Sequence, residues 1–335
     1  MSWKITRKYH DQDLTTTAFL ITGGAGFIGS NLVQYLLDNG AGLVRVLDNF
    51  SNGYHENINQ FKGDSRFELV EGDICDPAVC EEVCKGIDYI SHQAALGSVP
   101  RSINNPLATH EANATGFLNV ITAAKNAGVK QMAYASSSSV YGDNTELPKF
   151  EDKTGNPLSP YATSKKTNEL YAGVFKTVYD FNSVGLRYFN IFGPNQSPEG
   201  PYAAVIPLYM NALLANKSGK IFGDGEQSRD FTFVENAVQA NVKAMFTPHE
   251  EVYGKVCNIA CGEKTSVKSL YEVLRNAAGS DAEPEYCPPR TGDIRDSLAS
   301  IERAQKYLNY DPQVDIKEGL EITLEWFKAN HFKAV

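Results

Sequence analysis

The chain has 335 residues, of which 42% are hydrophobic, so it can build one sizeable core and still have room for a second, smaller lobe. Its net charge of −9 argues against the broad basic face that binding to nucleic acid or to an anionic membrane requires. Residues 1–17 are polar and charged, and no later stretch is apolar over the length of a bilayer. We therefore expect a cytoplasmic protein with no nucleic-acid partner and no membrane partner.

Six cysteines are spread along the chain, and none of them forms the Cys-x-x-Cys pair of a zinc or redox site. Cys80 and Cys84 would share one face of a helix, but no histidine near them completes a metal-binding pattern. We predict that these two are free, buried thiols and that the chain has no metal site.

Short apolar runs alternate with helical stretches through the first half of the chain. The predicted strands are residues 18–22, 43–47, 67–70, 89–92, 132–136 and 183–187. The predicted helices are residues 31–39, 77–85, 109–127 and 161–180. This alternation predicts an α/β fold with a doubly wound, parallel Rossmann sheet that has helices on both faces.

The regular alternation ends near Phe189, where proline, glycine and asparagine begin to interrupt shorter elements. We expect residues 1–188 to form the Rossmann domain, with segments near 228–262 returning to it. Residues 189–335 would then form a smaller C-terminal lobe that covers and binds the substrate.

A glycine-rich turn follows the first predicted strand. It reads Gly23-Gly24-Ala25-Gly26-Phe27-Ile28-Gly29. Gly23 permits the tight turn, Gly26 lets the backbone approach a pyrophosphate, and Gly29 lets a helix that opens at Ser30 pack close to the strand. The N-terminus of that helix would face the phosphates. Asp48 ends the next strand, where its carboxylate would accept hydrogen bonds from ribose hydroxyls and repel a 2′-phosphate, so the pattern predicts NAD rather than NADP.

Two further strand ends carry residues suited to a dinucleotide. Asp73, in Gly72-Asp73-Ile74, would place an acceptor near the adenine, although a turn-capping aspartate explains it almost equally well. The segment His92-Gln93-Ala94-Ala95 provides small residues where the cofactor must pass close to the backbone. We interpret His92 itself as structural.

A serine cluster, residues 136–139, ends the fifth predicted strand, and Tyr161 and Lys165 follow in the next predicted helix. Their spacing of four places both side chains on one helix face. A tyrosine has an ordinary pKa of about 10, so its use as a base near neutral pH needs roughly 4 kcal/mol of electrostatic help. Lys165 and a positive nicotinamide ring can provide that help.

Together these motifs resemble the extended short-chain dehydrogenase/reductases that modify nucleotide sugars. The similarity runs from about residue 18 to residue 326 and includes Asp48-Asn49-Phe50 and Arg187-Tyr188-Phe189-Asn190. It implies that Ser137 binds the 4-oxygen of the sugar, that Tyr161 is the acid/base, and that Lys165 holds the nicotinamide ribose. It also implies that Asn113 completes a helix and water network; the alternative, a glycosylation site, does not suit the expected compartment. The residues expected at the cofactor are Gly23, Gly26, Phe27, Ile28, Gly29, Asp48, Asn49, Asp73, Ile74, Gln93, Ala94, Ala95, Asn113, Tyr161, Lys165 and Tyr188.

The residues after Ser137 indicate the reaction. Related dehydratases and decarboxylases place an acidic residue in this segment, whereas this chain has Ser138 and Ser139, which we expect to contact the substrate. The missing carboxylate favours simple redox chemistry at C4. The resemblance then implies a 4-epimerase, in which Tyr161 removes the 4-hydroxyl proton while NAD takes the C4 hydride, the 4-keto sugar turns over, and the hydride returns to its other face.

The second half of the chain is similar to the UDP-binding segments of these epimerases. Asn190 would hold a diphosphate oxygen, and the uracil would lie between Ala204-Val205 and Phe222. Three charged residues would close on the phosphates and ribose: Arg229, Arg290 and Asp293. For the two arginines a solvated surface position is the alternative, and for Phe222 the alternative is the core.

Two details narrow the sugar. Ser297 stands where epimerases restricted to non-acetylated hexoses have a tyrosine, so it leaves room beside C2. The segment 95–102 resembles that of epimerases preferring N-acetylated substrates, in which Gly97 and Ser98 face the acetamido group. Relatives acting on 6-carboxylated sugars share this segment, so the two arginines nearby could meet a carboxylate or be surface ion-pair partners: Arg101 and Arg295.

The resemblance therefore implies a 4-epimerase of UDP-N-acetylglucosamine and UDP-N-acetylgalactosamine. The alternatives are the corresponding N-acetylhexosaminuronates and UDP-glucose/galactose. It also implies a homodimer, formed through helices 109–127 and 161–180.

Overall fold

The computed structural model describes residues 3–198, 204–289 and 295–330. Its centre is a seven-stranded sheet whose neighbouring strands are all parallel, in the order β11-β6-β5-β4-β1-β2-β3. The strands are β1 (Ala18–Thr22), β2 (Leu43–Asp48), β3 (Phe67–Glu71), β4 (Tyr89–His92), β5 (Gln131–Ser137), β6 (Ser183–Tyr188) and β11 (Lys255–Ile259). The six predicted strands and the doubly wound α/β fold are confirmed. The sequence reasoning assigned no strand to residues 255–259, although it expected segments near 228–262 to return to this domain. The pairing of β11 with β6 joins segments about 70 residues apart in the chain.

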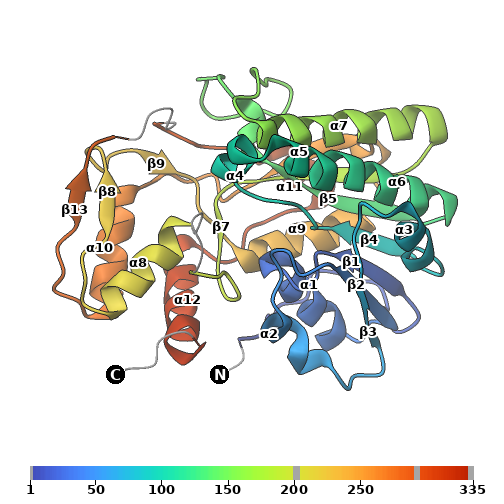
Figure 1. The fold of residues 1–335 in the computed structure, drawn as a ribbon, viewed down its shortest axis with the longest axis horizontal. Coiled ribbons are helices and arrows are strands. Elements are labelled where there is room, and N and C mark those ends of the chain that lie inside the picture. The colour runs from blue at the N-terminus through green and yellow to red at the C-terminus, as the bar shows by residue number, and fades with distance from the viewer. Residues whose placement is uncertain (1–2, 199–203, 290–294, 331–335) are drawn as a thin grey trace.

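Helices cover both faces of the sheet and bury a separate core on each (Figure 1). In β1, Phe19 and Ile21 enter one core and Leu20 enters the other, because successive side chains of a strand point to opposite faces. The first core packs against α1 (Phe27–Asp38) and α9 (Val234–Phe246), and the second against α3 (Pro77–Val83), α6 (Gly116–Asn126) and α7 (Pro160–Tyr179). A strand covered on both faces is apolar throughout, which is why these runs were recognisable.

Two predicted helices differ from the structure. The first begins at Phe27 rather than near Ser30, because the Ser30 amide already donates to the Gly26 carbonyl at 3.0 Å and closes the first turn. The predicted helix 109–127 is interrupted: α5 (Pro106–His110) passes into a π-helical turn over Glu111–Thr115 before α6 begins. Such a π-turn is a single turn inserted within a helix, and hydrophobic periodicity along the chain does not by itself reveal it.

A second lobe lies beside the sheet and has its own core (Figure 1). Its helices are α8 (Val205–Leu214), α10 (Val267–Ala278) and α12 (Ile316–Asn330). Its short strands are β7 (Ile191–Phe192), β8 (Lys220–Phe222), β9 (Ser228–Arg229), β10 (Thr232–Phe233), β12 (Thr265–Ser266) and β13 (Glu285–Cys287), which pair two by two. The remaining short helices are α2 (His55–Ile58), α4 (Val99–Asn104) and α11 (Glu302–Leu308).

The six cysteines are all free. Cys80 and Cys84 are buried, as predicted; Cys257 is buried too, and the other three cysteines are partly exposed. Within the described residues no group of three or more His, Cys, Asp or Glu side chains is placed to hold a metal ion. Over the same part of the chain, no helix has the length and apolar character that crossing a membrane requires.

Candidate functional site

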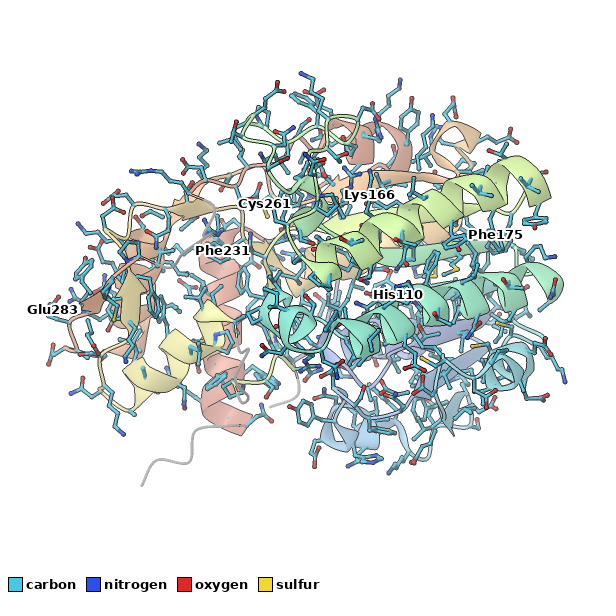
Figure 2. All side chains as sticks on the ribbon, turned by 45° about the horizontal axis from the view of Figure 1, so that its top comes forward. His110, Lys166, Phe175, Phe231, Cys261 and Glu283 are labelled. Carbon is cyan, nitrogen blue, oxygen red and sulfur yellow. The ribbon has the colours of Figure 1, made fainter. Side chains whose placement is uncertain are left out.

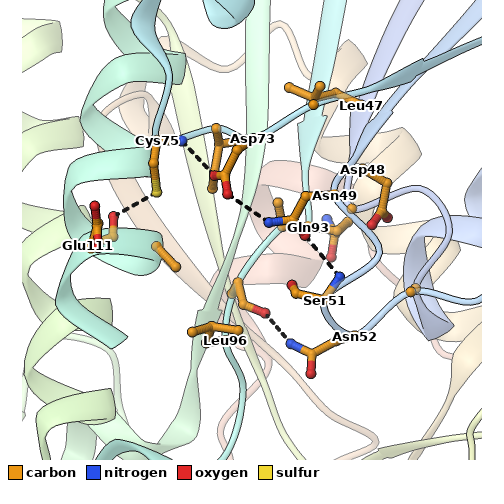
Figure 3. A pocket seen from close by; sticks show the side chains of 18 of the residues that line it. Leu47, Asp48, Asn49, Ser51, Asn52, Asp73, Cys75, Gln93, Leu96 and Glu111 are labelled. Atoms are coloured by element: carbon orange, nitrogen blue, oxygen red, sulfur yellow. Dashed lines mark hydrogen bonds between the residues drawn. The ribbon is translucent and has the colours of Figure 1, made fainter. Parts of the chain in front are cut away.

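A cavity of about 320 Å³ lies at the carboxyl ends of β1 to β4 (Figure 3). Ligands of open α/β sheets bind at this edge, outside the ends of the strands. The structure brings together there these predicted cofactor residues: Gly23, Gly26, Asp48, Asn49, Asp73, Ile74, Gln93, Ala94 and Ala95. The sequence reasoning missed Ser51, Asn52 and Gly53, although their position directly after the Asp48 strand end was a usable signal.

The glycine-rich turn has no room for side chains. Gly23 has a φ of +68°, and a Cβ there would lie 2.6 Å from the amide nitrogen of Ala94. A Cβ on Gly29 would lie 2.2 Å from the carbonyl oxygen of Gly23. Because only glycine fits, the backbone at the start of α1 is bare and can approach a pyrophosphate closely. The residues present at this turn therefore fit NAD.

Asp48 presents a buried carboxylate to the same cavity and is 7% exposed. Its oxygens accept hydrogen bonds of 2.9 Å from the amides of Ala25 and Phe50. Burial raises the pKa of Asp48, and these two amide hydrogen bonds partly offset the effect. The carboxylate keeps lone pairs with which it can accept ribose hydroxyls, which also fits NAD.

Asp73 both caps a turn and lines the cavity. One carboxylate oxygen accepts the amide of Cys75 and the other accepts the side-chain amide of Asn49, each at 2.8 Å (Figure 3). The two interpretations of this aspartate therefore do not compete. Asn49, predicted as a cofactor residue, is held by this bond between the ends of β2 and β3.

Gln93 and Tyr188 are joined in a polar network under the cavity. The Tyr188 hydroxyl donates to Gln93 Oε1 at 3.1 Å and accepts from Asn241 Nδ2 at 2.7 Å. Gln93 Nε2 donates to Ser91 Oγ and to Asn241 Oδ1, both at 2.9 Å. Asn241 lies on α9, about 150 residues along the chain, and nothing in its local sequence marks it.

Ser137, Tyr161 and Lys165 converge where β5 meets α7. The Tyr161 hydroxyl lies next to Ser137, and Lys165 Nζ donates to the carbonyl oxygen of Ala135 at 2.8 Å. Burial raises the pKa of Tyr161, whereas the Ser137 hydrogen bond lowers it. Burial lowers the pKa of Lys165 to about 8. The predicted pair thus lies on one helix face, next to the predicted serine.

The rest of the serine cluster forms a short 3-10 turn. Ser137 Oγ accepts the amide of Ser139 at 3.1 Å and so fixes the start of this turn. The Ser139 hydroxyl is buried and has no hydrogen-bond partner among the described residues, which leaves it available to a ligand. Ser138 is partly buried beside it.

Asn113 and His92 both make bonds within the protein. Asn113 lies in the π-helical turn, where its side chain accepts from the Leu96 amide at 2.7 Å and donates to Ser164 Oγ at 3.2 Å. It thereby ties α7 to the loop after β4. His92 is 1% exposed, bonds Thr22 Oγ1 through Nδ1, and has its pKa lowered to about 3, mainly by burial.

A second cavity, of about 430 Å³, lies in the second lobe. Four predicted substrate residues line it together: Asn190, Val205, Phe222 and Arg229. Phe222 thus contributes to a cavity wall rather than to the closed core. The sequence reasoning missed Gln227, whose Nε2 donates to the Phe222 carbonyl at 2.6 Å, although it stands between the predicted residues Phe222 and Arg229.

Other predicted residues line neither of these two cavities. Phe27 and Ile28 pack partly buried against the core of the second lobe, and Ala204 is exposed just before α8. Arg290 and Asp293 lie outside the described residues.

The residues predicted beside the acetamido group occupy two loops. Ser98 has a φ of +102° and caps α4, and no atom would lie within 4 Å of a Cβ on Gly97. The Ser297 amide donates to the Ser228 carbonyl at 3.1 Å, next to β9. Arg101 donates to Asn52 Oδ1, and Arg295 forms a 3.7 Å ion pair on the surface.

Comparison with known proteins agrees with this geometry. A family model described as the NAD dependent epimerase/dehydratase family matches residues 19–260. The UDP-glucose 4-epimerase of Mycolicibacterium smegmatis is 38% identical over 311 residues, which cover 92% of this chain and 98% of that protein.

Two solved structures are also similar. A UDP-N-acetylglucosamine 4-epimerase from Methanobrevibacter ruminantium, in complex with UDP-N-acetylmuramic acid, has a TM-score of 0.89 at 38% identity and covers 94% of this chain and 99% of its own. The UDP-glucose 4-epimerase of Thermus thermophilus, in complex with NAD, has a TM-score of 0.83 at 31% identity and covers 94% and 100%. The chain therefore belongs to the NAD-dependent epimerase/dehydratase family.

Proposed function

We propose that this NAD-dependent UDP-sugar 4-epimerase interconverts UDP-N-acetylglucosamine and UDP-N-acetylgalactosamine. The observation that carries the N-acetyl preference is that two small residues, Ser297 and Gly97, stand at the positions expected beside C2 of the sugar. Open space surrounds Gly97, which is consistent with room for an acetamido group. Similarity to the Methanobrevibacter ruminantium UDP-N-acetylglucosamine 4-epimerase supports the same preference.

In this proposal residues 1–188, with α9 and β11 returning to the sheet, hold the cofactor. Gly23, Gly26 and Gly29 would accommodate the pyrophosphate and Asp48 would bind a ribose. When bound, NAD supplies reversible hydride acceptance from C4 and a positive nicotinamide ring. The lobe over residues 189–335 would hold the UDP group in the 430 Å³ cavity.

Tyr161, Lys165 and Ser137 would move and hold the proton. The Tyr161 hydroxyl would take the proton of the sugar 4-hydroxyl in one direction and return it in the other. With a pKa of about 8, Lys165 is mostly protonated at neutral pH, so its charge favours the ionised tyrosine. Ser137, which lies next to Tyr161, would turn its single hydroxyl proton to the same 4-oxygen and orient it.

The substrate assignment can be tested by incubating the purified enzyme separately with UDP-N-acetylglucosamine, UDP-glucose and the UDP-N-acetylhexosaminuronate, and following the C4 epimer of each by NMR. We expect the highest kcat/KM with UDP-N-acetylglucosamine. A higher value for the uronate would instead support the 6-carboxylated alternative.

The role of Tyr161 can be tested separately. Tyr161→Phe removes only the hydroxyl, so epimerisation should be lost while UDP-sugar binding, measured by calorimetry, stays close to that of the wild type. Retained turnover would show that another group is the base.

We also propose that the chain forms a homodimer. Leu170, Val174 and Val178 follow one another at a spacing of four on α7 and are 51–63% exposed. On the neighbouring α5, Leu107 is 81% exposed. Figure 2 shows α6 and α7 running side by side across this face of the molecule. Exposed apolar side chains on neighbouring helices suit a self-complementary helix-on-helix contact with a second copy.

A further inference from the structure

β5 and α7 are joined by contacts that follow a regular spacing on the helix. The Tyr161 hydroxyl lies next to Ser137, and one turn later Lys165 donates to the Ala135 carbonyl at 2.8 Å. Four residues further along the helix, Glu169 lies on the same face and is also buried. On β5, Ser136 lies between Ala135 and Ser137, the two strand residues that these contacts involve.

Glu169 makes the third contact between α7 and β5, and it also bonds to the next strand, β6. Ser136 Oγ donates to Glu169 Oε1 at 2.7 Å. Arg187, which lies directly opposite Ser136 in β6, donates through Nε to Oε1 at 2.8 Å and through Nη2 to Oε2 at 2.9 Å. The carboxylate is thus held by a bidentate guanidinium and a hydroxyl at once, an arrangement that fixes direction as well as distance.

Arg187 is itself fixed on its other sides. Its Nη1 donates to the Glu151 carbonyl at 2.9 Å, and its guanidinium lies 4.8 Å from the ring centre of Tyr141. Arg187 is 1% exposed and Glu169 8%, so water does not screen the pair. Neither residue lines the two cavities of the candidate site.

A buried ion pair of this kind contributes little net stability compared with apolar residues of similar size, because desolvation of both charges offsets their attraction. What it can provide is a single, well-defined arrangement of the elements that it joins. Here those elements are the helix that carries Tyr161 and Lys165 and the strand that carries Ser137.

We propose that Glu169 and Arg187, acting through Ser136, are positioning residues that hold α7 in register against the end of β5, so that the Tyr161 and Ser137 hydroxyls stay aligned. The inference rests on the proposed roles of Tyr161 and Ser137. It assigns a function in catalysis to an ion pair that does not touch the reacting atoms.

Two variants test the inference. Ser136→Ala keeps the ion pair and removes its link to β5. The double variant Glu169→Met/Arg187→Met replaces both charges by apolar side chains and leaves no buried charge unpaired, whereas either single change would. Lys166→Met is the matched control, because Lys166 also bonds Glu169, at 3.4 Å, but from a partly exposed position on the same helix.

We expect Ser136→Ala and the double variant to lower kcat by about tenfold, less than the roughly 100-fold loss that a misplacement of one ångström can cause, with KM for the UDP-sugar unchanged. The pH at which kcat reaches half its maximum should rise in both, because the hydrogen bond that lowers the pKa of Tyr161 would no longer be held in place. Lys166→Met should match the wild type in kcat and in pH profile.

The pH profile separates positioning from a purely structural role. A wild-type kcat and pH midpoint in Ser136→Ala would overturn the inference even if the double variant failed to fold. A lower kcat accompanied by a lower melting temperature and an unchanged pH midpoint would overturn it as well. Turnover in Tyr161→Phe would instead refute the proposed function, so the two failures are distinguishable.

Discussion

The ammonium group of Lys165 lies 2.8 Å from the carbonyl oxygen of Ala135, on a side chain that is 2% exposed. A charged lysine at such a position loses most of its hydration, which is why burial lowers its pKa from 10.5 to about 8. The enzyme therefore keeps a cation on the helix face that carries Tyr161, at a cost in stability.

This cost predicts a pH-dependent effect of Lys165→Met. Between pH 8 and 10.5 the unfolded chain binds the lysine proton and the folded chain does not, so wild-type stability rises with pH across that window. Below pH 8 the buried, charged Lys165 destabilises the wild type most. In that range the free energy of unfolding of the variant should exceed that of the wild type by up to about 3 kcal/mol, while its activity is lost. The gain should shrink towards zero near pH 10.5. Denaturant unfolding at pH 7 and pH 10.5 measures it, and equal stability of variant and wild type at pH 7 would contradict the prediction.

Gly23→Ala tests the glycine turn, and Gly40→Ala, just beyond the C-terminal end of α1, is its matched control. Both glycines have positive φ, +68° and +80°, so each alanine incurs the left-handed backbone cost of about 1 kcal/mol. Only at Gly23 does the new methyl group also collide with the backbone of Ala94, whereas nothing lies within 4 Å at Gly40. Gly23→Ala should lower both the melting temperature and the affinity for NAD, and Gly40→Ala should lower the melting temperature slightly. The proposed NAD turn would be misplaced if both variants bound NAD equally well.

Ser297→Tyr tests the proposed N-acetyl preference. A tyrosine at this position would fill the space beside C2, where an acetamido group needs more room than a hydroxyl. We expect kcat/KM for UDP-N-acetylglucosamine to fall at least tenfold more than kcat/KM for UDP-glucose, since a change of one methylene in an enzyme pocket is already worth roughly 10–200-fold and an acetamido group is larger. UDP-glucose is the internal control. Equal losses on the two sugars would show that Ser297 does not lie at C2.

Val174→Glu/Val178→Glu tests the proposed dimer. Two carboxylates on the apolar face of α7 would meet their own copies across a two-fold contact and repel. The variant should sediment as a monomer at concentrations where the wild type is a dimer. Val273→Glu is the control, because Val273 is also partly exposed, at 39%, but lies on α10 in the second lobe. A wild-type protein that sediments as a monomer would refute the dimer itself.

Much of the cofactor site could be predicted because its signals are local. The glycine turn, Asp48 and Asp73 each stand at the end of an apolar run, and parallel strands bring their carboxyl ends to one edge. The Tyr161–Lys165 pair was recognisable for the same reason, since a spacing of four specifies one helix face.

The sequence by itself thus determined the order of strands and helices in the first half, the glycine turn and the four-residue spacing of Tyr161 and Lys165, because these depend on neighbouring residues. Only the tertiary structure decided that β11 joins the sheet beside β6, that Asn241 bonds Tyr188 from α9, and that the carboxylate of Glu169 meets Arg187. These contacts join residues 18 or more positions apart, and whether two such side chains meet depends on how sheet and helices pack rather than on any local pattern.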